Sequence, residues 1–134
     1  MKRLTADDFF TGLLAALKVA QPQRDVISLR GQRFDRALDR LFRKLVELAP
    51  QYQLVVSFRI RLHPIHGDSI TVRDAIYRAA QRDIVSLDNP EYQDIRLKLS
   101  VAEGEAKLRS IPGGKPLFAK LAQEFDEAYE LATA

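Results

Sequence analysis

The stretch QRFDRALDRLFRKLVELAP, residues 32–50, sets the architecture expected for the whole chain. Its apolar side chains recur at the spacing of one helix face; they are Phe34, Ala37, Leu38, Leu41, Phe42, Leu45 and Leu48. Pro50 follows this pattern and is typical of a helix stop. The stretch therefore predicts an amphipathic helix over 32–49 with one face in a core.

The segment after this helix predicts a half-buried β-strand. From Leu54 to Leu62, apolar residues at the even positions alternate with mostly polar residues at the odd positions, among them Arg59 and Arg61. A period of two is the pattern of a strand with one buried face. We therefore expect the side chains of Arg59 and Arg61 to point outward.

The N-terminal region predicts a helix that begins after Thr5. A threonine oxygen accepts a free backbone N–H at a helix start, and the carboxylate of Asp8 suits the positive end of the helix dipole. Apolar residues then recur at helical spacing from Phe9 to Leu17, and Pro22 follows them. Thr71 with Asp74 repeats the capping pattern, which predicts a third helix at that point.

The last third of the chain predicts a hairpin and two helices. The residues DNPE at 88–91 are typical of a turn between two strands, 84–87 and 92–100. In the second strand the alternation predicts buried Ile95, Leu97 and Leu99 and exposed Arg96 and Lys98. A Ser-x-x-Glu capping box at 100–103 predicts a brief helix, and helical spacing over 117–129 predicts a final one.

Together these elements follow the order α-α-β-α-β-β-α-α over a single domain, residues 1–134. The order predicts an α+β fold with a small, largely antiparallel sheet covered by helices on one face. The absence of cysteine excludes disulfides, thiolate metal sites and a cysteine nucleophile.

The N-terminal residues predict neither a signal peptide nor a membrane span. Lys2 and Arg3 are followed by Asp7 and Asp8, which interrupt the apolar run that a signal peptide needs. The apolar stretch 13–17 is far shorter than the roughly 20 residues that cross a bilayer. We therefore expect a cytoplasmic protein with no membrane partner.

Charge is unevenly divided between the two halves of the chain. Residues 1–67 contain 12 Lys or Arg and 6 Asp or Glu, whereas residues 68–134 contain 9 and 12. The candidate binding residues are the basic side chains expected on exposed faces; they are Arg33, Arg36, Arg40, Arg43, Lys44, Arg59, Arg61, Arg96 and Lys98. Because the planar guanidinium group matches phosphate geometry, this basic N-terminal half favours a nucleic-acid-binding domain.

Two alternative functions remain open. The same charge pattern suits an acidic protein partner or head-to-tail self-association, so the second hypothesis is a protein-interaction adaptor or oligomeric subunit. The third is a metal-dependent hydrolase or nuclease around His63, His66 and Asp68, which carry metal-ligating side chains. Pro64 favours an extended chain between the histidines, so a structural role is the stronger interpretation of these three residues.

The sequence favours a protein without enzymatic activity. No serine lies in a Gly-x-Ser-x-Gly motif, and PGGKP at 112–116 lacks the full P-loop pattern, which leaves a turn between helices as its expected role. No pattern indicates a cofactor or a small-molecule substrate.

Overall fold

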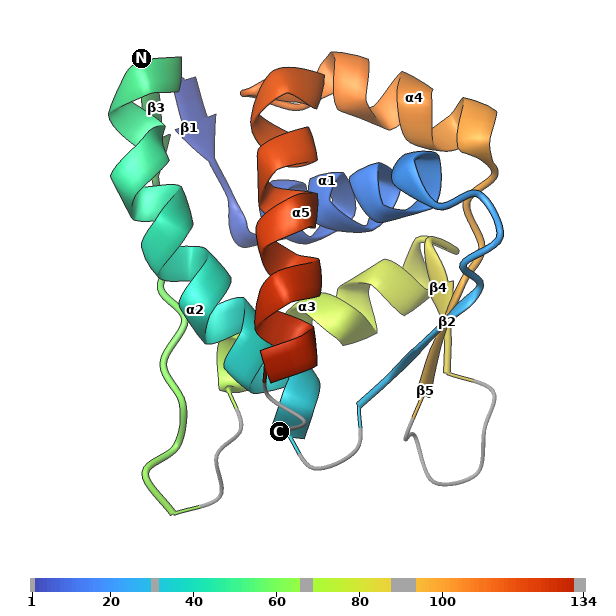
Figure 1. Ribbon diagram of the computed structural model, residues 1–134, viewed down its shortest axis with the longest axis horizontal. Coiled ribbons are helices and arrows are strands. Elements are labelled where there is room, and N and C mark those ends of the chain that lie inside the picture. The colour runs from blue at the N-terminus through green and yellow to red at the C-terminus, as the bar shows by residue number, and fades with distance from the viewer. Residues whose placement is uncertain (1, 30–31, 66–68, 88–93, 132–134) are drawn as a thin grey trace.

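The computed structural model describes residues 2–29, 32–65, 69–87 and 94–131 and shows an α+β fold (Figure 1). Its helices are α1 (Ala6–Ala20), α2 (Arg33–Leu48), α3 (Ile70–Gln81), α4 (Val101–Ser110) and α5 (Gly114–Leu131). Its strands are β1 (Lys2–Leu4), β2 (Val26–Ser28), β3 (Leu54–Val56), β4 (Val85–Ser86) and β5 (Asp94–Leu97), and a 3-10 turn, η2 (Ala49–Tyr52), follows α2. The fold class and the expected order are confirmed, with β1 and β2 as additional short strands.

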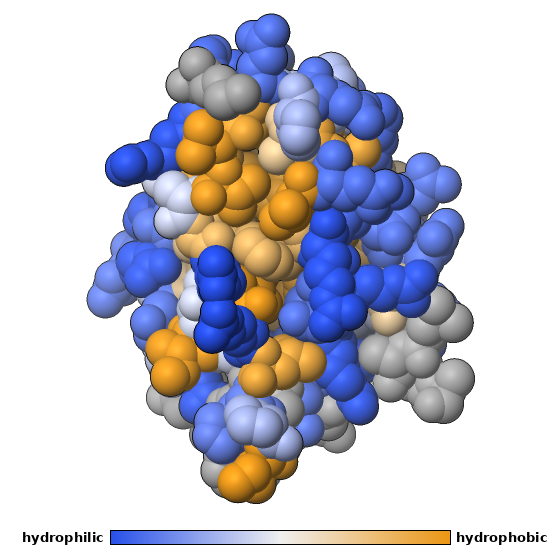
Figure 2. All heavy atoms as spheres, turned by 90° about the vertical axis from the view of Figure 1, so that its left-hand side faces the viewer, coloured by the Kyte–Doolittle hydropathy of each residue, from blue (hydrophilic) through white to orange (hydrophobic). Residues whose placement is uncertain are grey.

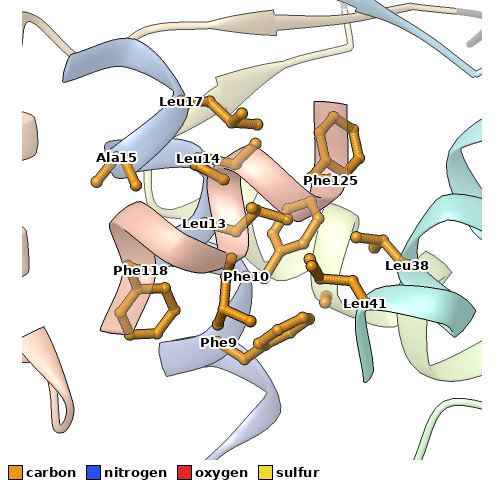
Figure 3. Packing of buried hydrophobic residues seen from close by; sticks show 14 of the residues in the cluster. Phe9, Phe10, Leu13, Leu14, Ala15, Leu17, Leu38, Leu41, Phe118 and Phe125 are labelled. Atoms are coloured by element: carbon orange, nitrogen blue, oxygen red, sulfur yellow. The ribbon is translucent and has the colours of Figure 1, made fainter. Parts of the chain in front are cut away.

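Helix α1 lies at the centre of the core because it is apolar on every side. Every residue from Phe9 to Lys18 is buried, and α3, α4 and α5 all pack against this helix. Side chains from α2 and α5 meet those of α1 in Figure 3. Gly12 makes one of these contacts possible, because a Cβ atom there would lie 2.6 Å from the ring of Phe118. Although α1 is strongly apolar, none of the described helices is long and apolar enough to cross a membrane.

Helix α2 packs against α5 through the apolar stripe expected from the sequence. Six of the seven stripe residues are buried, and Phe42 is half-buried. The ring of Phe34 lies between two others in edge-to-face geometry, with centroids 6.0 Å from Phe10 and 5.7 Å from Phe125. Such aromatic pairs add to the stabilisation from burial, so they fix α2 relative to both α1 and α5.

The strands form two small sheets rather than one. β1 pairs with β3 in parallel, with Lys2 opposite Leu54. β2, β5 and β4 form a separate antiparallel sheet, in which Val85 lies opposite Leu97. The hairpin is confirmed, with its inward residues buried and its outward residues exposed, although its expected turn at 88–91 lies outside the described residues.

The strand expected over 54–62 is much shorter in the structure, where β3 covers only Leu54–Val56. Regular pairing ends at Val56, because β1 ends at Leu4 and Thr5 then caps α1. The Ser57 N–H still donates to the Leu4 carbonyl at 3.0 Å. Beyond this bond the alternation of less and more exposed side chains continues to residue 62, and no strand among the described residues pairs with it. The sequence pattern therefore predicted the faces of the segment correctly and the extent of its pairing wrongly.

Helix starts follow the expected hydroxyl caps at two places and differ at a third. Thr5 accepts from the Asp8 N–H at 3.1 Å, and the capping box at 100–103 forms in both directions. Helix α3 is capped by Ser69 instead of Thr71, through a bond of 3.4 Å from the Val72 N–H. The Thr71 hydroxyl does not cap the helix but donates to the Arg59 carbonyl at 2.9 Å. This bond joins α3 to the segment after β3.

The turn expected at PGGKP, 112–116, is confirmed only in part, because residues 111–113 connect α4 to α5 and Gly114 already begins α5. Gly113 and Gly114 have φ angles of +88° and +57°, a conformation that side chains with a Cβ rarely adopt.

Lys18 is a charged residue inside this core, and it is paired. Its ammonium group donates to Asp25 Oδ1 at 2.8 Å and to the Arg24 carbonyl at 3.2 Å. The hydrogen bond and charge of Lys18 lower the pKa of the Asp25 carboxyl below its usual 3.8. A buried ammonium with two acceptors avoids most of the penalty for leaving water.

We predict that Leu41→Ala lowers the free energy of unfolding by about 2–5 kcal/mol, because Leu41 is fully buried in the core and its truncation leaves a cavity. Urea denaturation monitored by circular dichroism measures this change. Val46→Ala, on the same helix at a half-exposed position, should change stability by less than about 0.5 kcal/mol. Equal losses at both positions would contradict the observed burial.

We also predict that Asp25→Asn destabilises the protein at neutral pH and not in strong acid. A carboxyl whose pKa is lowered by folding contributes stability above its unfolded pKa, and this contribution disappears as pH falls through the folded pKa. Urea denaturation of both proteins at pH 7 and at about pH 2 measures the difference. A difference that persists unchanged in acid would show that the Lys18 ion pair is not its source.

Candidate functional site

The structure places Arg33 inside the fold and not on a binding surface. Its Nε donates to the Tyr129 carbonyl at 2.8 Å, and its guanidinium carbon lies 3.7 Å from the centre of the Tyr129 ring. The Tyr129 hydroxyl in turn donates to the Ser28 carbonyl at 2.7 Å. Arg33 therefore joins the start of α2 to the end of α5, a role that the sequence pattern did not indicate.

Other basic residues of α2 form an exposed stripe along the helix. Arg36, Arg40 and Arg43 are exposed, and Lys44 is half-buried. Arg43 pairs with Asp39 one turn earlier at 3.1 Å, an exposed ion pair that contributes little stability. Arg40 makes no side-chain hydrogen bond or ion pair within the described ranges.

Arg96 and Lys98 belong to a different part of the fold from Arg59 and Arg61. Arg96 is on β5 and Lys98 directly follows it, whereas Arg59 and Arg61 follow β3, which belongs to the other sheet. Lys98 also pairs with Asp83 at 3.3 Å. The four residues therefore do not form one basic sheet face.

A groove lies between α2 and residues 54–62. Its volume is about 950 Å³. Nine of its thirteen lining residues are apolar; they are Phe42, Val46, Ala49, Pro50, Leu54, Val56, Phe58, Ile60 and Leu62. Asp39, Arg43, Arg59 and Arg61 complete it. Figure 2 shows this side of the molecule, where an apolar patch runs between hydrophilic side chains.

The polar lining of the groove is mostly cationic. Arg59 and Arg61 are exposed, and neither side chain pairs with a carboxylate in the part of the chain that the structure describes. The carboxylate of Asp39 forms an ion pair with Arg43. The groove therefore offers two unneutralised guanidinium groups beside an apolar floor.

Residues 58–62 border the groove along their whole length. All five consecutive residues line it. In an extended chain one face would contribute only alternate residues, so the groove borders the edge of this segment. The sequence pattern indicated the two faces of the segment, but it carried no signal for an open edge.

The groove also contains an apolar residue that the sequence analysis did not select. Val46 is 50% exposed and lies one helical turn after Phe42, at the border between the apolar and basic faces of α2. In the sequence, the signal for this surface was Val46, a valine outside the buried stripe. Its position four residues after Phe42 shows that it widens the apolar face of α2 on the Phe42 side.

The proposed metal ligands are described only in part. His63 is exposed, and its Nδ1 accepts from the Ile65 N–H at 3.2 Å, so it closes a local turn. His66 and Asp68 lie outside the described residues. Within residues 2–29, 32–65, 69–87 and 94–131, no three His, Asp or Glu side chains form a metal-binding group.

Comparisons with protein-family models, with curated proteins and with solved structures found no match to this chain.

We predict that Arg33→Ala lowers the free energy of unfolding by about 1–2 kcal/mol, because it removes a charged hydrogen bond and a cation–π contact between α2 and α5. Arg40→Ala is the matched control on the same helix and should have almost no effect. Thermal and urea unfolding measure both. Equal stability of the two variants would show that the Tyr129 contacts do not stabilise the fold.

Proposed function

We propose that this protein is a non-enzymatic binding module that holds an acidic segment of a partner polypeptide in the groove between α2 and residues 54–62. The observation that carries the proposal is an apolar floor beside the guanidinium groups of Arg59 and Arg61, which have no carboxylate partner among the described residues. A ligand that fills such a groove needs apolar groups for the floor and anionic groups for the rim.

The chemistry of the rim favours carboxylates. A guanidinium group binds a carboxylate through two parallel hydrogen bonds, and such charge-assisted bonds are stronger than neutral ones. The half-exposed Val46 and the half-buried Phe42 beside the rim add apolar area that a partner side chain can cover. Aspartate or glutamate interleaved with apolar residues supplies both kinds of contact.

Nucleic-acid binding, the leading hypothesis from the sequence, is the second candidate function. The exposed stripe of Arg36, Arg40 and Arg43 beside the groove supports it. Single-stranded nucleic acids bind where bases stack on open aromatic rings. Here the ring of Phe58 packs against those of Phe42 and Phe9, with centroids 5.4 Å and 5.3 Å apart. The other apolar residues of the groove are all aliphatic. This floor favours peptide side chains over bases.

Selection from a library of random peptides displayed on phage tests the proposal. We expect enrichment of peptides that combine Asp or Glu with apolar residues. Binding of a labelled selected peptide, measured by fluorescence anisotropy, should weaken about tenfold or more in the double variant Arg59→Glu with Arg61→Glu, because like charges then meet at the rim.

The matched control is Lys107→Glu with Arg109→Glu, which makes the same charge change at exposed positions of α4. It should bind as the wild type does, and circular dichroism verifies that both double variants are folded. An equal loss in the control, or no enrichment, would refute the proposed groove. Binding of single-stranded DNA or RNA that is tighter than peptide binding and lost in the groove variant would favour the nucleic-acid hypothesis.

A further inference from the structure

We infer that the partner segment binds by strand addition, with its backbone hydrogen-bonded to the open edge of residues 58–62. This inference rests on the proposed function and specifies how the ligand lies in the groove. The occupant is an extended segment of another polypeptide in which acidic and apolar residues alternate.

The bonds already made by the segment show which edge is open. The Ser57 N–H donates to Leu4, and the Arg59 carbonyl accepts from Thr71. Both residues are odd-numbered, and in an extended chain the backbone groups of alternate residues point to the same edge. The odd positions therefore face β1 and α3, and the even positions face the opposite edge.

The even-numbered backbone groups are available for a partner strand. Within the described part of the chain, the N–H and C=O groups of Phe58, Ile60 and Leu62 make no hydrogen bond with another backbone group. Backbone polar groups that leave water need a partner, so any ligand that covers this edge has to supply donors and acceptors. An added strand does so through its own backbone, as in other strand-addition complexes.

The side chains of the segment determine which ligand sequence fits. Ile60 faces inward and is buried, with Phe58 and Leu62 half-buried beside it, whereas Arg59 and Arg61 face outward. Neighbouring strands place their side chains in register on the same face, so an added strand has apolar residues on the inner side and carboxylates beside the arginines. The α2 wall, with Phe42 and Val46, closes the inner side.

The dimensions of the groove agree with a short ligand. Residues 58–62 span about 13 Å when extended, at about 3.3 Å per residue. A ligand strand of about five residues covers this length. The predicted ligand is therefore a short alternating sequence of apolar and acidic residues.

The test uses an acetylated and amidated peptide in which Val and Glu alternate over about seven residues. The control peptide has the same composition with all Val residues first and all Glu residues last. We expect the alternating peptide to bind at least about tenfold more tightly, because only this order places every carboxylate on the arginine side.

Amide hydrogen exchange, followed by NMR, reports the backbone pairing directly. Addition of the alternating peptide should slow exchange at the even amides of Phe58, Ile60 and Leu62 and leave Arg59 and Arg61 nearly unchanged. N-methylation of the peptide at alternate residues should abolish binding for the set that faces residues 58–62, while methylation of the other set leaves binding unchanged.

The outcomes separate this inference from the proposed function. Binding that is lost in the Arg59→Glu, Arg61→Glu variant but shows no even-numbered protection overturns strand addition and leaves the groove as the binding site. Failure of the alternating peptide, while library-selected acidic peptides bind the groove, also overturns strand addition. Protection of the same amides in the protein alone at high concentration would identify a second copy of the chain as the occupant and overturn the inferred partner.

Discussion

The burial of α1 is the constraint on which the rest of the structure depends. A helix without a polar face is stable only when other elements cover it on all sides. Here α3, α4 and α5 pack directly on α1, and Phe34 of α2 reaches Phe10 on the same helix. The contact of Phe118 with Gly12 shows how close this packing is. The strands are short and peripheral because the helices already provide most of the core.

The candidate binding edge follows from the same constraint. The chain has to leave β1 after Leu4, because Thr5 caps α1, which starts at Ala6 and runs into the core. Residues beyond Val56 therefore continue past the end of their partner strand. An unpaired extended segment is a liability for aggregation, and charged side chains on such a segment reduce that risk. Arg59 and Arg61 meet this requirement, and they also select anionic ligands.

The sequence predicted the helices and the alternating faces well, because both depend on local periodicity. It failed where the outcome depends on a distant partner. Residues 54–62 have the pattern of a strand, but the length of β1 decides how much of it is paired. Ser69 and Thr71 are both plausible caps, and the position of the Arg59 carbonyl gives Thr71 a different role. The basic residues were identifiable by type, whereas the groove required the placement of α2 beside the segment after β3.

The charge asymmetry of the chain has partly an internal explanation. Arg24 from the basic half pairs with Asp126 on α5 at 2.8 Å, and Arg33 binds the carbonyl of Tyr129 on the same helix. The two halves therefore complement each other within one fold, and bulk net charge overstates the attraction for an outside partner. The informative charges are those without an internal partner among the described residues. Arg59 and Arg61 belong to this class and also border an apolar groove, so they carry more information about function than the total of basic residues does.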